Sequence, residues 1–138
     1  MSSYLQKHNK IMYSDNWYTP KTIYEKFMIE GYHDPCPLFG EDVILRDSLF
    51  GEMTNINKKM FINPPYSNLG EWVDWTLKNY VKYNKNVTLL VPARTDSKWF
   101  HKLLNHDCDL EFIKGRLKFG GSKTSAPFPS ILVHLCKS

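Results

Sequence analysis

The sequence is poor in cysteine and contains no long apolar run. Its three cysteines, Cys36, Cys108 and Cys136, are odd in number and widely spaced, so they indicate neither a disulfide framework nor a zinc site, and they favour a reducing compartment. No apolar run approaches the roughly 18 residues that a membrane-spanning helix needs, and no signal-peptide pattern opens the chain. We therefore expect a soluble, cytoplasmic protein with no bound metal and no membrane segment.

The sequence also lacks internal repeats and low-complexity segments. Its 138 residues allow one domain with a substantial core, and an apolar fraction of 42% excludes a disordered chain. We expect residues 1–14 to form a mobile polar arm and residues 15–138 to form the single domain.

Acidic residues are scarce in the C-terminal part of the chain. Residues 85–138 contain 9 Lys and Arg against 4 Asp and Glu, whereas residues 1–84 contain 9 against 10. This asymmetry fits an anionic partner, although a solvated surface rich in lysine is the more common cause.

The stretch around residues 59–67 has the strongest functional pattern. A short apolar run stops at Asn63-Pro64-Pro65-Tyr66, and a helical pattern follows, which predicts a strand, a rigid turn and a helix. The prolines restrict the residues before them and have no N–H. The Asn63 side-chain oxygen and the Pro64 carbonyl are thus two acceptors beside the aromatic ring of Tyr66. This combination suits a planar group with an exocyclic amine, such as adenine.

Flanking patterns predict an α/β sheet. Apolar spacing indicates helices at 20–30 and 70–83, the first capped by Thr19 with Pro20 as its first residue. The continuous apolar run 86–92 is typical of a central strand buried on both faces. Asp96 is the expected cap of a further helix.

Two aspartates follow short predicted strands. Asp34 ends a strand within 31–34, and Asp47 follows the apolar residues of 42–50. In an open α/β sheet, ligands bind beyond the carboxyl ends of the strands, so both carboxylates are candidate ligand groups. Asp34 has the alternative explanation of a turn cap, since Asp before Pro is common in turns, and Asp47 is equally well explained as a surface turn residue.

Basic residues cluster in the C-terminal part. Arg94 and Lys98 follow the central strand and are candidate phosphate contacts. Residues 111–119 alternate in polarity and predict a strand with Lys114, Arg116 and Lys118 on one face. A flexible loop at 120–127, which includes Lys123, would join it to a last strand at 130–136 in an antiparallel hairpin. The basic face would read a nucleic-acid backbone, or it would merely protect a sheet edge.

Five segments together resemble one family. They are residues 16–20 (NWYTP), 34–36 (DPC), 61–67 (FINPPYS), 90–96 (LVPARTD) and 112–119 (FIKGRLKF). The chain is similar to the phage-type, Dam-like DNA adenine-N6 methyltransferases that use S-adenosylmethionine. This resemblance implies a Rossmann-like methyltransferase sheet, mostly parallel with an antiparallel C-terminal hairpin. It also implies DNA as the partner and a phage- or prophage-encoded protein in a bacterial host.

The resemblance also implies roles for individual residues. Asn63, Pro64, Pro65 and Tyr66 would form the catalytic, amine-binding motif. The implied cofactor-binding residues are Trp17, Thr19, Pro20, Asp34, Pro35 and Asp47. The implied nucleic-acid-binding residues are Arg94, Lys98, Lys114, Arg116, Lys118 and Lys123.

The chain departs from the family pattern in its N-terminal half. Pro35-Cys36-Pro37 stands where a glycine-rich loop is usual, and only 29 residues separate Asp34 from Asn63. We therefore expect an abbreviated front half, with a cofactor pocket that is shallow, completed by a second subunit in a homodimer, or lost. Two alternative functions remain open: a catalytically inactive descendant that binds nucleic acid or protein, and methylation of another planar amine or amide, such as RNA adenine or protein glutamine.

Overall fold

A computed structural model describes residues 18–34, 59–83, 86–120 and 124–136 of the chain. Its elements, in chain order, are α2 (Lys21–Ile29), β1 (Met60–Ile62), the 3-10 turn η1 (Tyr66–Asn68), α4 (Leu69–Tyr83), β2 (Val87–Pro92), α5 (Lys98–Leu104), β3 (Cys108–Phe112) and β4 (Ser130–Leu135). The predicted α/β class is therefore confirmed. The helices predicted at 20–30 and 70–83 and the strand predicted at 86–92 are confirmed as α2, α4 and β2.

The strands form one mixed sheet in the order β1-β2-β4-β3. β1 and β2 run parallel, with Ile62 opposite Leu89, and β4 runs antiparallel to both β2 and β3. The segment after α2 extends the β1 edge, because His33 forms a parallel bridge with Met60. The His33 amide donates to the Lys59 carbonyl at 2.7 Å, and the His33 carbonyl accepts from the Phe61 amide at 2.9 Å. All six residues of β2 are buried, as expected for a strand covered on both faces.

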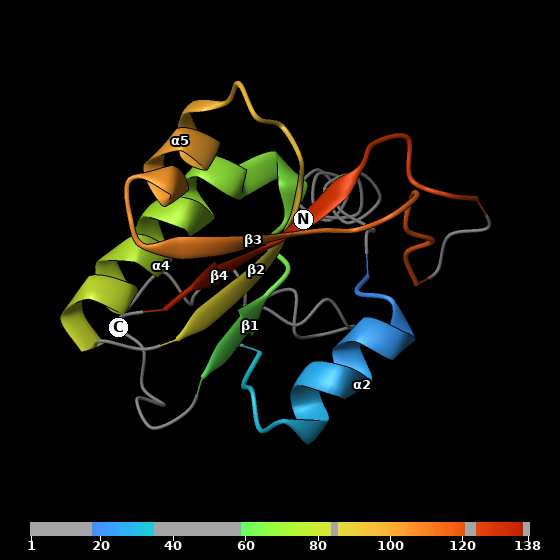
Figure 1. Ribbon diagram of the computed structural model, residues 1–138, viewed down its shortest axis with the longest axis horizontal. Helices are drawn as coiled ribbons and strands as arrows, with labels where there is room; N and C mark the ends of the chain where they lie inside the picture. The colour runs from blue at the N-terminus through green and yellow to red at the C-terminus, as the bar shows by residue number, and fades with distance from the viewer. Residues whose placement is uncertain (1–17, 35–58, 84–85, 121–123, 137–138) are drawn as a thin grey trace, which may run out of the picture.

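Helices cover both faces of the sheet. As Figure 1 shows, α4 and α5 lie together on one face and α2 lies on the other. On the first face, Trp72 and Val73 pack with Ile62, Leu89 and other strand residues in the larger core cluster. On the second face, the Phe27 ring of α2 stacks on Phe61 at a centroid distance of 4.5 Å. Alternate residues of β1, β2 and β4 thus contribute to two apolar cores.

The boundaries of α2 differ from the prediction at its start. Pro20 is the N-cap residue, with an extended ψ of 138°, and no side chain caps the helix. Thr19 is therefore not the cap, and its hydroxyl is hydrogen-bonded to Asn63 instead. The helix ends in a Schellman motif, in which the Tyr32 amide donates to the Phe27 carbonyl and the Gly31 amide donates to the Met28 carbonyl. Gly31 adopts a φ of 86°, a value that glycine accommodates without strain.

The cap of α5 and the basic strand were also predicted wrongly. Ser97, not Asp96, caps α5, since its hydroxyl accepts from the Phe100 amide at 3.3 Å. The strand expected at 111–119 is β3, which ends at Phe112. Three residues later Gly115 has a φ of 76°, so the backbone turns away from the strand direction. The antiparallel pairing of β3 with the last strand is confirmed, and residues 113–129 form the connection.

A polar link ties three strands together on the α2 side of the sheet. The hydroxyl of buried Thr88 on β2 lies 2.8 Å from His134 Nδ1 on β4, and His134 Nε2 lies 3.2 Å from Glu111 Oε1 on β3. Thr88 is buried, and its hydroxyl is paired with His134, which is in turn paired with Glu111. We interpret this link as structural.

Several expectations concern residues outside the described ones. They are the arm at 1–14, the strand at 42–50, and the side chains Trp17, Pro35, Asp47 and Lys123. Within the described ranges, no helix is long and apolar enough to cross a membrane, and no group of His, Cys, Asp and Glu side chains is arranged to hold a metal ion.

Candidate active site

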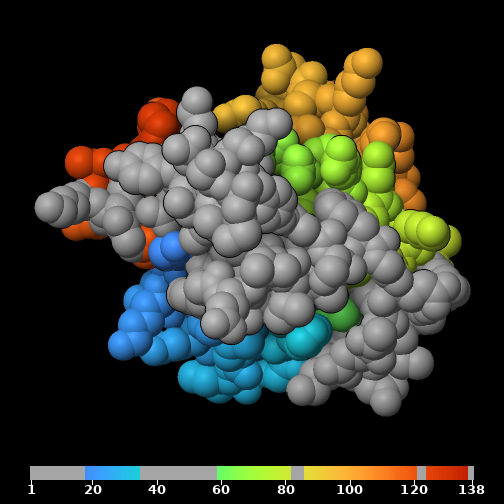
Figure 2. Space-filling view, turned by 180° about the vertical axis from the view of Figure 1, so that it is seen from behind, coloured from blue at the N-terminus to red at the C-terminus, as the bar shows by residue number. Residues whose placement is uncertain are grey.

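Three segments that are distant in the sequence meet beyond the carboxyl end of β1. The turn at 63–66 is held to the N-terminal segment by a hydrogen bond from Asn63 Nδ2 to Thr19 Oγ1, at 3.1 Å. The neighbouring Tyr18 carbonyl accepts from the Gly120 amide at 2.8 Å. Seen from behind in Figure 2, the blue start of the described chain accordingly lies at the same end of the molecule as the orange and red of the 113–130 region.

Asn63 is the central polar side chain of this meeting point. It directly follows β1 and is 1% exposed, in a strand and turn whose residues 60–65 are all buried. Its amide nitrogen faces Thr19, and its side-chain oxygen is buried. A buried amide in a fixed orientation presents a donor on one side and an acceptor on the other.

The two prolines hold the turn in an extended conformation before the chain becomes helical. Pro65 has φ −60° and ψ 131° and precedes η1, and the Asn68 amide donates to the Pro65 carbonyl at 3.1 Å. This hydrogen bond closes the turn one residue after Pro64, so it does not engage the Pro64 carbonyl. The predicted sequence of strand, rigid turn and helix is confirmed.

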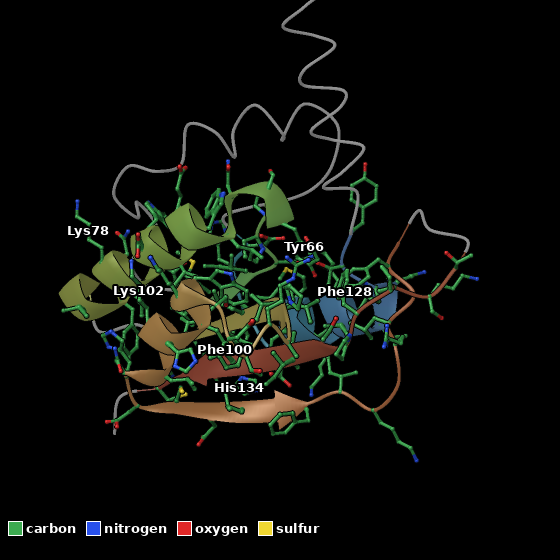
Figure 3. The ribbon with its side chains drawn as sticks, turned by 90° about the horizontal axis from the view of Figure 1, so that it is seen from above. Tyr66, Lys78, Phe100, Lys102, Phe128 and His134 are labelled. Atoms are coloured by element: carbon green, nitrogen blue, oxygen red, sulfur yellow. The ribbon has the colours of Figure 1, made fainter. Side chains whose placement is uncertain are left out.

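Tyr66 packs into an aromatic cluster with Phe119 and Phe128. Its ring centroid lies 5.4 Å from that of Phe128 and 6.3 Å from that of Phe119, both edge to face. Figure 3 shows Tyr66 and Phe128 at one end of the sheet, with Lys78 toward the other end of α4. The Tyr66 side chain is partly buried, so the connection after β3 covers part of the ring that the sequence predicts to stack on a base.

Electrostatics at Tyr66 link it to Arg94. Burial raises the pKa of the Tyr66 hydroxyl well above its usual value, and the positive charge of Arg94 opposes this increase. Arg94 is exposed and lies two residues after the end of β2. Since β2 runs parallel to β1, the carboxyl ends of both strands lie at the same edge of the sheet. The structure therefore brings Arg94 to the same end of the sheet as Asn63 and Tyr66.

The raised pKa of Tyr66 predicts a pH-dependent stability. The unfolded phenol ionises near pH 10, whereas the buried phenol keeps its proton, so the unfolded state binds fewer protons above about pH 10 and stability falls as pH rises. We expect Tyr66→Phe to remove this component, which is on the order of 1 kcal/mol at about pH 11. Urea unfolding between pH 7 and pH 11 measures it.

The partly buried Tyr32 supplies a control for that experiment. Tyr32→Phe removes a phenol hydroxyl from the edge-to-face contact with Phe27, away from Tyr66. Stability curves of the wild type and Tyr66→Phe that stay parallel across the whole pH range would contradict the prediction.

The cofactor residues expected in the described chain are only partly brought together. Asp34 follows His33, which forms a parallel bridge with Met60, so Asp34 lies beside β1. Thr19 contacts Asn63 directly. The Pro20 carbonyl accepts from the Ile23 and Tyr24 amides at the start of α2.

The expected basic face is not a strand face. Lys98 begins α5, and Lys114, Arg116 and Lys118 are exposed on the connection after β3. Between them, Ile113 and Leu117 pack against the α2-side core. The charges remain available to solvent, but their geometry is that of an irregular segment anchored by apolar side chains.

Sequence reasoning assigned no role to Ser130 or to Phe128. Ser130 begins β4 opposite Pro92 and is 2% exposed, and within the described ranges its hydroxyl has no hydrogen-bond partner. Phe128 covers Tyr66. Ser130 opens an apolar strand and Phe128 lies between prolines, and neither context distinguishes a site residue from a structural one.

The family described as DNA N-6-adenine-methyltransferase (Dam) matches residues 45–130, a range that contains the 63–66 turn, Arg94 and the basic connection. No curated protein matches the chain, and no solved structure matches it. Because the family match covers more than half of the sequence, the chain belongs to the DNA N-6-adenine-methyltransferase (Dam) family.

Proposed function

We propose that this protein transfers a methyl group from S-adenosylmethionine to the N6 amine of adenine in DNA. The observation that carries the proposal is the buried Asn63 at the carboxyl end of β1, followed by two prolines and Tyr66. Membership of the Dam family supports it.

Asn63 and Pro64 act on the adenine amine. The N6 lone pair is delocalised into the ring and is therefore a poor nucleophile. When the Asn63 side-chain oxygen and the Pro64 carbonyl accept its two hydrogens, the nitrogen moves toward tetrahedral geometry and the lone pair is directed out of the ring plane. The methylated nitrogen then loses one proton to solvent. This chemistry needs no Ser, Cys or His nucleophile.

The described residues fit a cofactor with a carboxylate, an amine and hydroxyl groups. Asp34 supplies an acid at the carboxyl end of the strand position next to β1, and the start of α2 provides amide donors suited to an anion. Trp17, Pro35 and Asp47 belong to the same proposed group. S-adenosylmethionine, when bound, supplies an electrophilic methyl group and leaves as the thioether.

We extend the proposal to the fold. The segment at His33 runs parallel to β1, β1 runs parallel to β2, and β4 runs antiparallel to β2. This order of three parallel segments and one antiparallel strand supports a Rossmann-like methyltransferase sheet. Residues 15–138 would form the single domain, with an abbreviated front half and residues 1–14 as an arm. A second subunit would complete the cofactor pocket if the front half is too short to enclose it.

DNA would approach from the end of the sheet that carries Tyr66 and Arg94. A base taken out of the duplex would reach Asn63 and stack on the accessible part of Tyr66. Arg94, Lys98 and the exposed Lys114, Arg116 and Lys118 would contact phosphates, which position the nucleic acid without reading its sequence. Lys123 belongs to the same proposed group.

Removing one of these charges provides a test of the DNA surface. We expect Arg94→Ala to weaken DNA binding roughly 10-fold at low salt and to lower the slope of log affinity against log salt by about 1. Fluorescence anisotropy over a salt series measures both quantities. Lys78→Ala is the matched control, since Lys78 is exposed at the other end of α4; equal losses in both variants would contradict the assignment.

The proposed function is tested by methyl transfer. The full chain is incubated with methyl-labelled S-adenosylmethionine and duplex or single-stranded DNA, and the nucleosides are then separated. Label in N6-methyladenine, with none in DNA that lacks adenine, is the expected result. RNA and a glutamine-containing peptide are parallel acceptors.

Other outcomes distinguish the alternatives. Label that appears only in RNA or in the peptide would assign the activity to a different planar amine or amide. Salt-sensitive DNA binding without transfer and without heat of cofactor binding would overturn the enzymatic proposal and favour a non-catalytic, nucleic-acid-binding protein.

A further inference from the structure

We infer that Thr19 is a positioning residue that orients the Asn63 amide for catalysis, instead of a ligand of the cofactor. This inference rests on the proposed function and assigns Thr19 a role within that site. It is carried by the hydrogen bond from Asn63 Nδ2 to Thr19 Oγ1, at 3.1 Å.

An asparagine needs such a contact at this position because its two ends differ. The oxygen accepts hydrogen bonds and the NH₂ group donates them. If the amide of Asn63 turned by 180°, its NH₂ group would face the hydrogens of the target amine, and the contact would become repulsive. In the structure the Thr19 hydroxyl accepts from Nδ2, and this contact holds the amide in the orientation that would present the oxygen to the substrate.

The segment that carries Thr19 is itself held in place. On one side the Tyr18 carbonyl accepts from the Gly120 amide at 2.8 Å, and on the other side the Pro20 carbonyl accepts from the Ile23 and Tyr24 amides at the start of α2. Gly120 allows this approach, because a Cβ atom added there would lie 3.2 Å from the Tyr18 Cβ atom. Backbone contacts on both sides thus hold the main chain that carries the Thr19 side chain.

The same geometry explains why Thr19 does not cap α2. A capping hydroxyl accepts from the second or third amide of its helix, and the cap position in this chain is Pro20. The Thr19 oxygen accepts instead from a residue 44 positions away in the sequence. The helix thereby loses a side-chain cap, and the turn after β1 gains an oriented amide.

The first test compares Thr19→Val with Thr19→Ser in steady-state methyl transfer. Valine has nearly the shape of threonine but offers no acceptor, whereas serine retains the hydroxyl. We expect Thr19→Val to lower kcat roughly 10-fold or more, which corresponds to the loss of a hydrogen bond that matters in the transition state. The KM and Kd for S-adenosylmethionine should change little, and Thr19→Ser should restore most of kcat.

A result of the opposite kind would overturn the inference. If Thr19→Val raises the Kd for S-adenosylmethionine and keeps the wild-type kcat at saturating cofactor, then Thr19 is a cofactor ligand. Equal loss of kcat in the valine and serine variants would also contradict it, because serine keeps the acceptor.

A second test does not depend on activity. In ¹⁵N-labelled protein the Asn63 side-chain NH₂ gives a pair of resonances, and we expect Thr19→Val to shift this pair and speed its exchange with water, while Thr19→Ser preserves it. Asn79 is the internal control, since its Nδ2 donates to the Trp75 carbonyl in α4. Unchanged Asn63 resonances in Thr19→Val would refute the orienting contact even if the proposed function fails; a shift in an inactive protein would support the contact and count against the function alone.

Discussion

Replacement of Asn63 by alanine should abolish most methyl transfer, with a fall in kcat on the order of 100-fold or more. The variant removes one of the two acceptors proposed to hold the adenine amine, and with it part of the proposed stabilisation of the tetrahedral nitrogen. The side chain is 1% exposed, so water does not readily replace the missing oxygen. Single-turnover transfer to adenine-containing DNA measures the loss.

The control for Asn63→Ala is a second buried asparagine. Asn79 is 3% exposed and donates to the Trp75 carbonyl in α4, so Asn79→Ala removes a buried amide of the same size outside the site. We expect both variants to lose stability, and only Asn63→Ala to lose transfer while it still binds S-adenosylmethionine in calorimetry. Wild-type kcat in Asn63→Ala would contradict its catalytic assignment.

Replacement of Trp72 by alanine should cost about 3–5 kcal/mol of the free energy of unfolding. Trp72 is among the largest fully buried side chains, packs in the core between α4 and the sheet, and lies edge to face with Trp75 at a centroid distance of 5.3 Å. Truncation would leave a cavity that rigid strand residues cannot fill. Urea denaturation followed by circular dichroism measures the change.

A substitution on the exposed side of the same helix provides the comparison. Val81 in α4 is 54% exposed, so Val81→Ala opens no cavity and should change stability by less than about 0.5 kcal/mol. A Trp72→Ala variant that unfolds at the same urea concentration as Val81→Ala would show that the α4 face contributes far less than its burial indicates.

The central part of this fold was predictable because local and global signals agree there. The run that became β2 is apolar at nearly every position, and a strand buried on both faces requires that pattern. The turn at 63–66 was predictable for a similar reason, since two consecutive prolines leave the backbone few alternatives. Helices α2 and α4 follow their apolar spacing.

The errors lie where a local rule is satisfied but does not decide the outcome. Asp96 and Ser97 are both residue types that cap helices well, and the choice of Ser97 depends on the position and direction in which the chain leaves β2. Thr19 satisfies the rule for a cap but contacts Asn63, a partner that no local pattern reveals. Residues 113–119 alternate like a strand, yet Gly115 in a left-handed conformation redirects them toward the α2-side core.

The candidate site was predictable in its residue types and not in its assembly. Asn63 and Tyr66 follow from their own motif, whereas the cover provided by Phe119 and Phe128 depends on the path of the long connection between β3 and β4. The hydrogen bond between Thr19 and Asn63 depends on α2 reaching the far face of the sheet. Such contacts join segments that are distant in sequence, and a single sequence holds no signal for them.

The bridge between Tyr18 and Gly120 has a consequence for the order of folding. It joins nearly the two ends of the described chain, so a chain emerging from the ribosome cannot form it until almost all of the domain has been synthesised. The entropy cost of closing so long a loop rises only slowly with its length. Formation of the sheet already restricts the chain between Tyr18 and Gly120, so most of that cost is met before the bridge forms. We therefore expect the sheet to form first and this closure last. In hydrogen exchange, the Gly120 amide should exchange through local opening of its hydrogen bond, while the β2 amides should exchange only on global unfolding.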